Sequence, residues 1–163
     1  MIRMTIAHLG LDRATNTPVV ILKEEGGERT LPIWIGAAEA NAIAMELRGE
    51  KPQRPLTHDL MKQVLVGLGG ELKRVLITSL RENTYLAELL IYHGEQFFEV
   101  DARPSDSIAL ALRVQAPIFA NEDLLDRSGD NSDDKTDEPS ADPDALKRFL
   151  SKLDPQDLGK FNP

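Results

Sequence analysis

Hydrophobic and polar positions along the first three quarters of the chain predict strands grouped in hairpins beside three helices. The predicted strands are apolar runs bounded by turn residues, at 2–11, 18–24, 29–35, 72–80, 85–92, 96–101 and 117–119. The predicted helices cover 37–48, 57–68 and 104–114, where apolar residues recur every three or four positions. Strands clustered in hairpins beside helices are typical of an α+β fold with a mixed or antiparallel sheet.

The second predicted helix has a clear amphipathic pattern. Thr57 has the side chain of a helix N-cap, and the preceding Leu56 can pack on the first turn. Gly69-Gly70 marks its end. We expect one face of this helix to be buried, formed by Leu60, Met61, Val64, Leu65 and Leu68.

A short internal echo raises the alternative of a duplicated hairpin–helix unit. Ile43-Ala44 and Leu47-Arg48 match Ile108-Ala109 and Leu112-Arg113 sixty-five positions later, and each run follows a predicted hairpin. The match is short enough for chance to explain it. A duplication would place 36–39 and 101–106 in comparable positions around a pseudo-twofold axis.

Charge and hydropathy divide the chain into three parts: a folded domain at 1–125, a linker at 126–144, and a terminal segment at 145–163. The linker holds two basic and eight acidic side chains and one apolar one, Ala141, so we expect it to be disordered. In the terminal segment, one face of a short helix is formed by Leu146, Phe149, Leu150 and Leu153. That helix is too short to be stable alone and must dock on the domain or on a partner.

Composition excludes several classes of function. The 163 residues include no cysteine, which excludes disulfides, thiolate zinc sites, iron–sulfur clusters and a cysteine nucleophile. The net charge of −8 argues against a tight, salt-driven grip on a nucleic-acid backbone. The first residues resemble neither a signal peptide nor a spanning helix, so we expect a cytoplasmic protein without a membrane segment.

Two polar clusters stand at predicted helix starts. Glu39 is near the third position of the first helix, where a carboxylate is favoured by the helix dipole or available to a metal ion. In the second cluster, His58 could act as general acid or base, Asp59 could orient it or hold a metal, and Arg54 could bind a phosphate. The alternative is that the second cluster only caps its helix.

The third cluster, at 101–106, is the densest. It holds two carboxylates, a guanidinium and a hydroxyl where a strand turns into a helix whose free N–H groups favour anions. Asp101 and Asp106 could hold Mg²⁺ or Mn²⁺, and Arg103 could stabilise charge on a phosphate beside Ser105. A self-contained ion pair with a helix cap is the competing interpretation. The eight aromatic residues are scattered and indicate no stacking platform.

Together these motifs resemble the bifunctional nuclease domain family. The resemblance covers about residues 1–125 and is carried, in order, by LPIWIG at 31–36, Glu39, RPLTHDL at 54–60, and DARPSDSIALALR at 101–113 with Pro117-Ile118. It implies an α+β domain, an oligomer, and nuclease activity on DNA and RNA. Motif positions taken over as functional are Glu39, Arg54, His58, Asp59, Asp101, Arg103, Ser105 and Asp106. One departure is Ser107, where alanine is common.

Two hypotheses follow. In the first, the protein is a nuclease: Glu39, Asp101 and Asp106 hold Mg²⁺ or Mn²⁺, and His58 moves a proton. His58, Asp59, Asp101 and Asp106 are then catalytic, while Arg54, Arg103 and Ser105 bind the substrate. In the second, the same residues form a non-catalytic module that binds an anion or a partner. Convergence of the clusters on one concave surface would favour the first.

Overall fold

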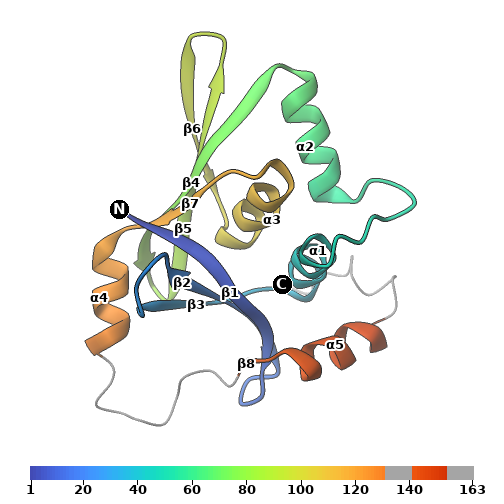
Figure 1. Cartoon of the computed structure of the whole chain (residues 1–163), viewed down its shortest axis with the longest axis vertical. Coiled ribbons are helices and arrows are strands. Elements are labelled where there is room, and N and C mark those ends of the chain that lie inside the picture. The colour runs from blue at the N-terminus through green and yellow to red at the C-terminus, as the bar shows by residue number, and fades with distance from the viewer. Residues whose placement is uncertain (131–140, 154–163) are drawn as a thin grey trace.

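The computed structural model describes residues 1–130 and 141–153, and confirms an α+β fold (Figure 1). Its helices are α1 (Ala37–Leu47), α2 (Thr57–Gly67), α3 (Pro104–Val114), α4 (Glu122–Asp130) and α5 (Pro143–Lys152). Its strands are β1 (Ile2–Asp12), β2 (Thr17–Glu24), β3 (Thr30–Trp34), β4 (Gly70–Arg81), β5 (Thr84–His93), β6 (Gln96–Ala102), β7 (Ile118–Ala120) and β8 (Ala141–Asp142). Elements expected from the sequence begin and end within about two residues of their predicted bounds.

The strands within the described residues form one sheet in the order β3-β2-β1-β7-β4-β5-β6, with β8 paired to β1. The short strand β7 joins two antiparallel groups. It pairs antiparallel with β1 through Met4 and Ile118, and parallel with β4 through Val75 and Ile118. The sheet is therefore mixed, as predicted. The order hairpin then helix occurs twice, as β2–β3–α1 and β5–β6–α3, while a duplication stays a prediction.

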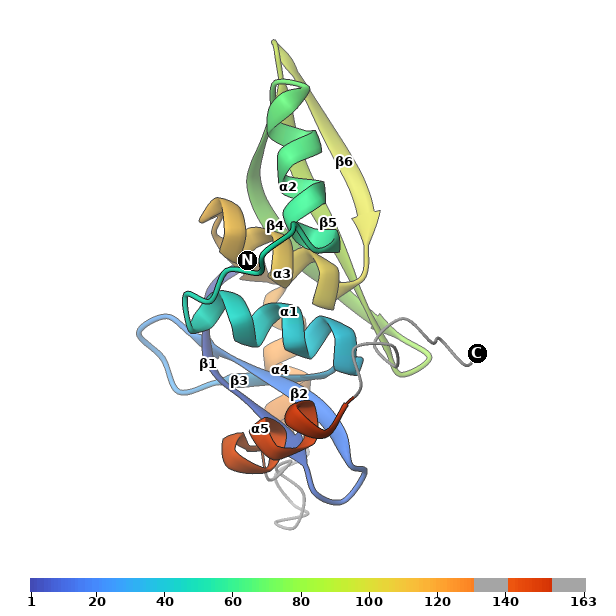
Figure 2. The ribbon, with the colours of Figure 1, turned by 90° about the vertical axis from the view of Figure 1, so that its right-hand side faces the viewer.

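Helices α1, α2 and α3 lie on the same side of the sheet (Figure 2). α3 is the central one: it packs on α1, α2, β4 and β5. Ile108, Ala109 and Ala111 of α3 have no exposed surface, and Leu110 is almost fully buried. The burial fixes the axis of α3 and with it the direction of every polar side chain at its two ends.

The linker prediction is wrong at both of its ends. Residues 126–130 belong to α4, whose Leu124 and Leu125 enter the core, and residues 141–144 form β8 and the start of α5. Helix α4 is tied to the sheet because Arg29 donates to Asp126 Oδ1 at 2.7 Å. The rest of the predicted linker, 131–140, lies outside the described residues.

The terminal helix docks on the domain rather than standing apart. Asp142 is its N-cap and accepts hydrogen bonds from the backbone N–H groups of Asp144 and Ala145, each at 2.9 Å. Leu146 is buried in the core. β8 approaches β1 so closely that a Cβ on Gly10 would lie 2.5 Å from the carbonyl carbon of Ala141, so only glycine fits there. The predicted tail at 154–163 lies outside the described residues.

The buried face predicted for α2 is wrong. Leu60, Val64 and Leu68 are 55%, 51% and 72% exposed, and Met61 is also exposed. Of the predicted stripe, Leu65 alone packs against the core. The N-cap is Leu56 rather than Thr57, and its backbone N–H donates to Asp59 Oδ2 at 2.9 Å. α2 is held mainly by polar contacts of its first turn, and most of its apolar surface is left open.

Candidate functional site

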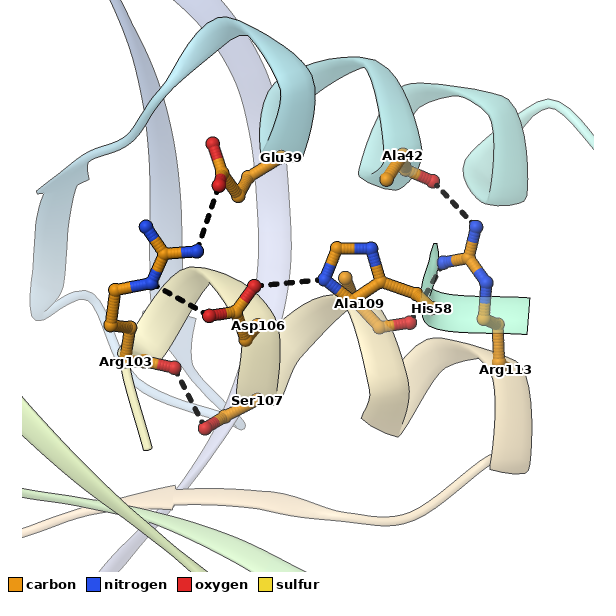
Figure 3. Close-up of polar contacts among 8 residues, drawn as sticks. All are labelled: Glu39, Ala42, His58, Arg103, Asp106, Ser107, Ala109 and Arg113. Carbon is orange, nitrogen blue, oxygen red and sulfur yellow. Dashed lines mark hydrogen bonds and ion pairs between the residues drawn. The ribbon is translucent and has the colours of Figure 1, made fainter. Parts of the chain in front are cut away.

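Polar side chains from the first turns of three helices meet beside α3 (Figure 3). Arg103, the N-cap of α3, donates from Nη2 to Glu39 Oε1 of α1 at 2.8 Å and from Nε to Asp106 Oδ2 at 2.7 Å. His58 Nε2 of α2 lies 2.9 Å from Asp106 Oδ1. We call Glu39, His58, Arg103 and Asp106 the polar network. It brings together residues from all three predicted clusters.

The local sequence explains why these side chains meet. Gly36 is the N-cap of α1, and Pro104 occupies the first position of α3, where its missing N–H costs nothing. Both helices follow a strand of the sheet, and they pack against each other, so their N-terminal ends lie at the same end of the pair (Figure 3). Ser107 Oγ donates back to the carbonyl of Arg103 at 2.9 Å and steadies the turn between strand and helix.

The contact between His58 and Asp106 is the chemically distinctive part of the network. A carboxylate only accepts hydrogen bonds, so Nε2 of His58 carries the hydrogen and donates it. That bond, with the one from Arg103, lowers the pKa of Asp106 from 3.8 to about 2, against the opposing effect of burial. Asp106 is therefore ionised at neutral pH and fixes the tautomer of His58 that carries its hydrogen on Nε2.

A second ion pair lies at the other end of α3. Arg113 Nε donates to Asp59 Oδ1 at 2.6 Å, and its other nitrogens donate to the carbonyls of Ala109 at 2.9 Å and Ala42 at 3.3 Å. Burial raises the pKa of Asp59, but the hydrogen bonds from Arg113 and from the backbone of Leu56 outweigh it and lower that pKa. Asp59, predicted to be catalytic, is thus engaged in joining α2 to α3.

Besides Asp59, and Ser105 at the start of α3, two more predicted site residues lie outside the network, Arg54 and Asp101. Arg54 is exposed in the loop before α2, and no hydrogen bond or ion pair of its side chain occurs within the described residues. Asp101 pairs with Glu88 across the sheet, whereas Ala102 pairs with the buried Ala87. Because side chains alternate between the faces of a strand, Asp101 points to the face of β6 away from the helices.

The predicted metal ligands do not form a metal site in the described residues. No group of three histidine, aspartate or glutamate side chains there lies close enough to hold a metal ion. Glu39 and Asp106 both face Arg103, which satisfies their charge, and Asp101 is on the other side of its strand. The residues in place do not fit a preformed Mg²⁺ or Mn²⁺ centre.

A cleft of about 520 Å³ opens next to the network. Arg103 and Ser105 line it from the start of α3, and Trp34 and Gly36 line it from the end of β3. Ser105 is buried. Sequence reasoning identified Arg103 and Ser105 but not Trp34, because no periodic signal linked that residue to the start of α3.

A family model described as the bifunctional nuclease domain matches residues 20–133, which is most of the chain. The chain belongs to this family. The matched range contains the whole polar network, the Asp59–Arg113 pair and the lining of the cleft except Thr17, whereas α5 lies outside it.

Relatives of this bifunctional nuclease domain fall into two groups. An uncharacterized protein of Mycobacterium tuberculosis is 40% identical over 159 residues, which cover 94% of this chain and 95% of that protein. Bifunctional nuclease 2 of Oryza sativa subsp. japonica is 30% identical over 117 residues, which cover 69% of this chain but 36% of the plant protein. Bifunctional nuclease 1 of Arabidopsis thaliana is 26% identical over 121 residues, or 72% of this chain and 37% of its own.

The likeness to the plant proteins therefore concerns the bifunctional nuclease domain, and the likeness to the mycobacterial protein extends over nearly the whole chain. Within the described residues of this domain and its extension, no helix has the length and apolar character that crossing a bilayer requires.

Proposed function

We propose that the protein is a nuclease that hydrolyses phosphodiester bonds in DNA or RNA. The observation that carries the proposal is the joining of Glu39, His58, Arg103 and Asp106 from three helices beside a cleft of about 520 Å³. The family and the plant proteins named bifunctional nucleases support the reaction class.

Arg103 is the group suited to the substrate phosphate. Its side chain is 56% exposed, and it lines the cleft. Its two carboxylate partners occupy Nε and Nη2, so donors remain on Nη1. A guanidinium in this position binds a phosphate oxygen and stabilises the charge that develops on it. The backbone N–H groups at the start of α3 add to the same preference for an anion.

His58 and Asp106 form the proton-handling pair of the proposal. Asp106 accepts from His58 Nε2 and keeps the ring in one orientation, leaving Nδ1 to take a proton from water or give one to the leaving oxygen. Divalent-metal assistance stays a prediction. Because the carboxylates in place do not fit a metal centre, we derive no step through a metal ion.

The test is cleavage of labelled single- and double-stranded DNA and RNA by protein purified identically for every variant. We expect Arg103→Gln and His58→Asn to lower the cleavage rate by about 100-fold each. Arg48→Gln is the matched control, because Arg48 also forms an exposed ion pair, with Glu50, but outside the network. Equal activity in all four proteins would contradict the proposal. Parallel assays with Mg²⁺, Mn²⁺ or a chelator decide the metal prediction.

A non-catalytic anion-binding module is the second candidate. It is favoured by the pairing within the network, where each charged side chain already has an oppositely charged or hydrogen-bonding partner. Such a module would bind an oligonucleotide through Arg103 and leave it intact. Binding lost in Arg103→Gln, with no cleavage by the unaltered chain, would support this candidate and exclude the nuclease.

We also propose that the protein assembles as a homo-oligomer through one apolar face, formed by Leu60, Met61, Val64 and the C-cap Leu68 of α2 and by Phe98 and Val100 of β6. Both elements lie at the end of the molecule away from α5 (Figures 1 and 2). β6 is also an edge strand with open backbone groups, and a second copy offers the same face.

Sedimentation equilibrium tests the assembly. We expect the unaltered chain to be a dimer or larger and Leu68→Glu to be a monomer that unfolds at the same denaturant concentration. Leu47→Glu is the matched control, since Leu47 is 48% exposed on α1, outside the apolar face. A monomeric unaltered chain at micromolar concentrations would contradict the assembly.

A further inference from the structure

The cleft beside Arg103 has a lining unlike the rest of the molecule. Its walls are the end of β3, the turn between β4 and β5, and the start of α3, with one residue from β2. The lining consists of Thr17, Ile33, Trp34, Ile35, Gly36, Leu80, Asn83, Thr84, Tyr85, Arg103, Pro104 and Ser105. None of these side chains is acidic and one is a cation, although the chain carries a net charge of −8. The ligand that fits such a lining has an apolar, flat part and an anionic part.

Trp34 provides the flat apolar surface. Its side chain is 46% exposed, which is unusual for the residue type with the largest apolar area. The indole Nε1–H donates to Asp12 Oδ2 at 2.9 Å, so the ring is held in place rather than free to turn. Tyr85 lines the same cleft from the start of β5, and burial raises its pKa, so its hydroxyl keeps its hydrogen. A fixed, exposed indole in a cleft that a second aromatic residue also lines is a surface on which a nucleobase can stack.

Arg103 and Ser105 provide the anionic end of the cleft. The guanidinium keeps donors on Nη1, and Ser105 lines the cleft two residues further along the chain. The volume of about 520 Å³ lies within the range of about 300–1,000 Å³ that is usual for small-ligand sites. That volume is large enough for one nucleotide.

We propose that this cleft binds one unpaired nucleobase of a single-stranded nucleic acid against Trp34, with the adjoining phosphate at Arg103 and Ser105. The inference rests on the proposed function, because it takes the nucleic acid as substrate and assigns where one of its bases lies. A base must leave its stack to enter the cleft, so such a site would make the protein selective for single strands or for unpaired ends.

Trp34 is the only tryptophan in the sequence, so its fluorescence reports on this cleft alone. The experiment titrates the unaltered chain with a single-stranded decanucleotide, with an abasic strand of the same length and charge, and with a duplex of the same sequence. A chelator is present to limit cleavage, and binding is followed in parallel by the anisotropy of a dye on the oligonucleotide. We expect saturable quenching of Trp34 by the base-containing strand and none by the abasic strand or the duplex.

Quenching by the abasic strand equal to that by the intact strand would overturn the inference, because the base would then have no part in the contact. So would binding seen by anisotropy with no change at Trp34. Absence of any binding by anisotropy would instead contradict the proposed function itself. Cleavage of the strand without any change in Trp34 fluorescence would support the nuclease proposal and contradict the base site.

Variants separate stacking from the structural role of Trp34. We expect Trp34→Ala to weaken binding of the intact strand by about ten-fold or more, and to leave binding of the abasic strand unchanged. Trp34→Phe keeps an aromatic face but loses the hydrogen bond to Asp12, and we expect it to restore most of the affinity. Equal weakening in both variants would contradict stacking and indicate that only the Asp12 contact matters. If Trp34→Ala does not fold, the fluorescence titrations of the unaltered chain with the intact, abasic and duplex oligonucleotides still test the base site.

Discussion

The two arginines of α3 form similar ion pairs in opposite surroundings. Arg103 and Arg113 each bind a carboxylate from another helix, Glu39 of α1 and Asp59 of α2 respectively. The side chain of Arg113 is 4% exposed and also donates to two backbone carbonyls, whereas that of Arg103 is 56% exposed beside a cleft. An arginine–carboxylate ion pair therefore joins two helices inside the molecule at one end of α3. At the other end, a similar pair leaves guanidinium donors available to a ligand.

The largest expected effect is on stability, at the buried end. Arg113→Met removes the partner of Asp59 and leaves that carboxylate beside a newly apolar neighbour, so we expect the free energy of unfolding to fall by about 3 kcal/mol or more. Urea unfolding followed by circular dichroism measures it. The double variant Asp59→Leu/Arg113→Met is expected to recover most of the loss, because no charge is left unpaired. A loss below about 1 kcal/mol in the single variant would contradict a structural role for this pair.

The same measurement on Arg103→Gln sharpens the contrast. Its side chain is more than half exposed, so solvent screens both of its ion pairs. We expect the free energy of unfolding to fall by no more than about 1 kcal/mol, although the cleavage rate falls by about 100-fold. A loss of stability as large as that of Arg113→Met would indicate that Arg103 mainly stabilises the fold, as Arg113 does.

The acid dependence of stability provides a third comparison. Asp106 has a pKa of about 2 in the folded chain and an ordinary value of 3.8, so it contributes stability above pH 3.8 that is lost as the pH falls towards 2. We expect the free energy of unfolding of the unaltered chain to decline across this window. Asp106→Asn should show a shallower decline there and converge with the unaltered chain at the lowest pH. Parallel pH profiles for the two proteins would contradict the assignment.

The smallest expected effect concerns Glu39, the carboxylate that competes with a phosphate for Arg103. Its Oε2 lies so close to Gly36 that a Cβ on the glycine would be 2.2 Å from it, so the carboxylate folds back over the start of α1. Glu39→Gln removes its negative charge and keeps its shape. We expect the affinity for a short oligonucleotide, measured by anisotropy, to rise a few-fold. Weaker binding in this variant would indicate that Glu39 positions Arg103 rather than restrains it.

Much of this architecture could be predicted from the sequence, because short-range patterns set it. Alternation and turn residues located the strands, and helix starts placed Glu39, His58, Arg103 and Asp106 at the ends of elements. The hydrogen bonds among these four residues could not be predicted from the sequence, because they depend on α1 and α3 lying side by side with their N-terminal ends together. Arg113 had a weak signal, as a single cation in a run of apolar residues, but nothing in sequence tied it to Asp59.

The error at α2 has a physical cause. A helical stripe of apolar residues shows that a face avoids water, but it does not say whether the same chain or another molecule covers it. Leu60, Val64 and Leu68 carry such a stripe and remain exposed. Trp34 and Tyr85 were missed for a related reason: they line the same cleft from β3 and β5, elements separated along the chain by two helices and a strand.

The position of β7 has a consequence for how the molecule forms during synthesis. This strand is three residues long and comes late in the chain, yet among the elements of residues 1–130 and 141–153 it is the one that pairs with both β1 and β4. The two halves of the sheet can each collapse as they leave the ribosome, but they have no shared hydrogen bonds until residue 120 has emerged. The long loop between these partners makes closure slow, and a nascent chain halted before that point would lack the pairing of β7 with β1 and β4.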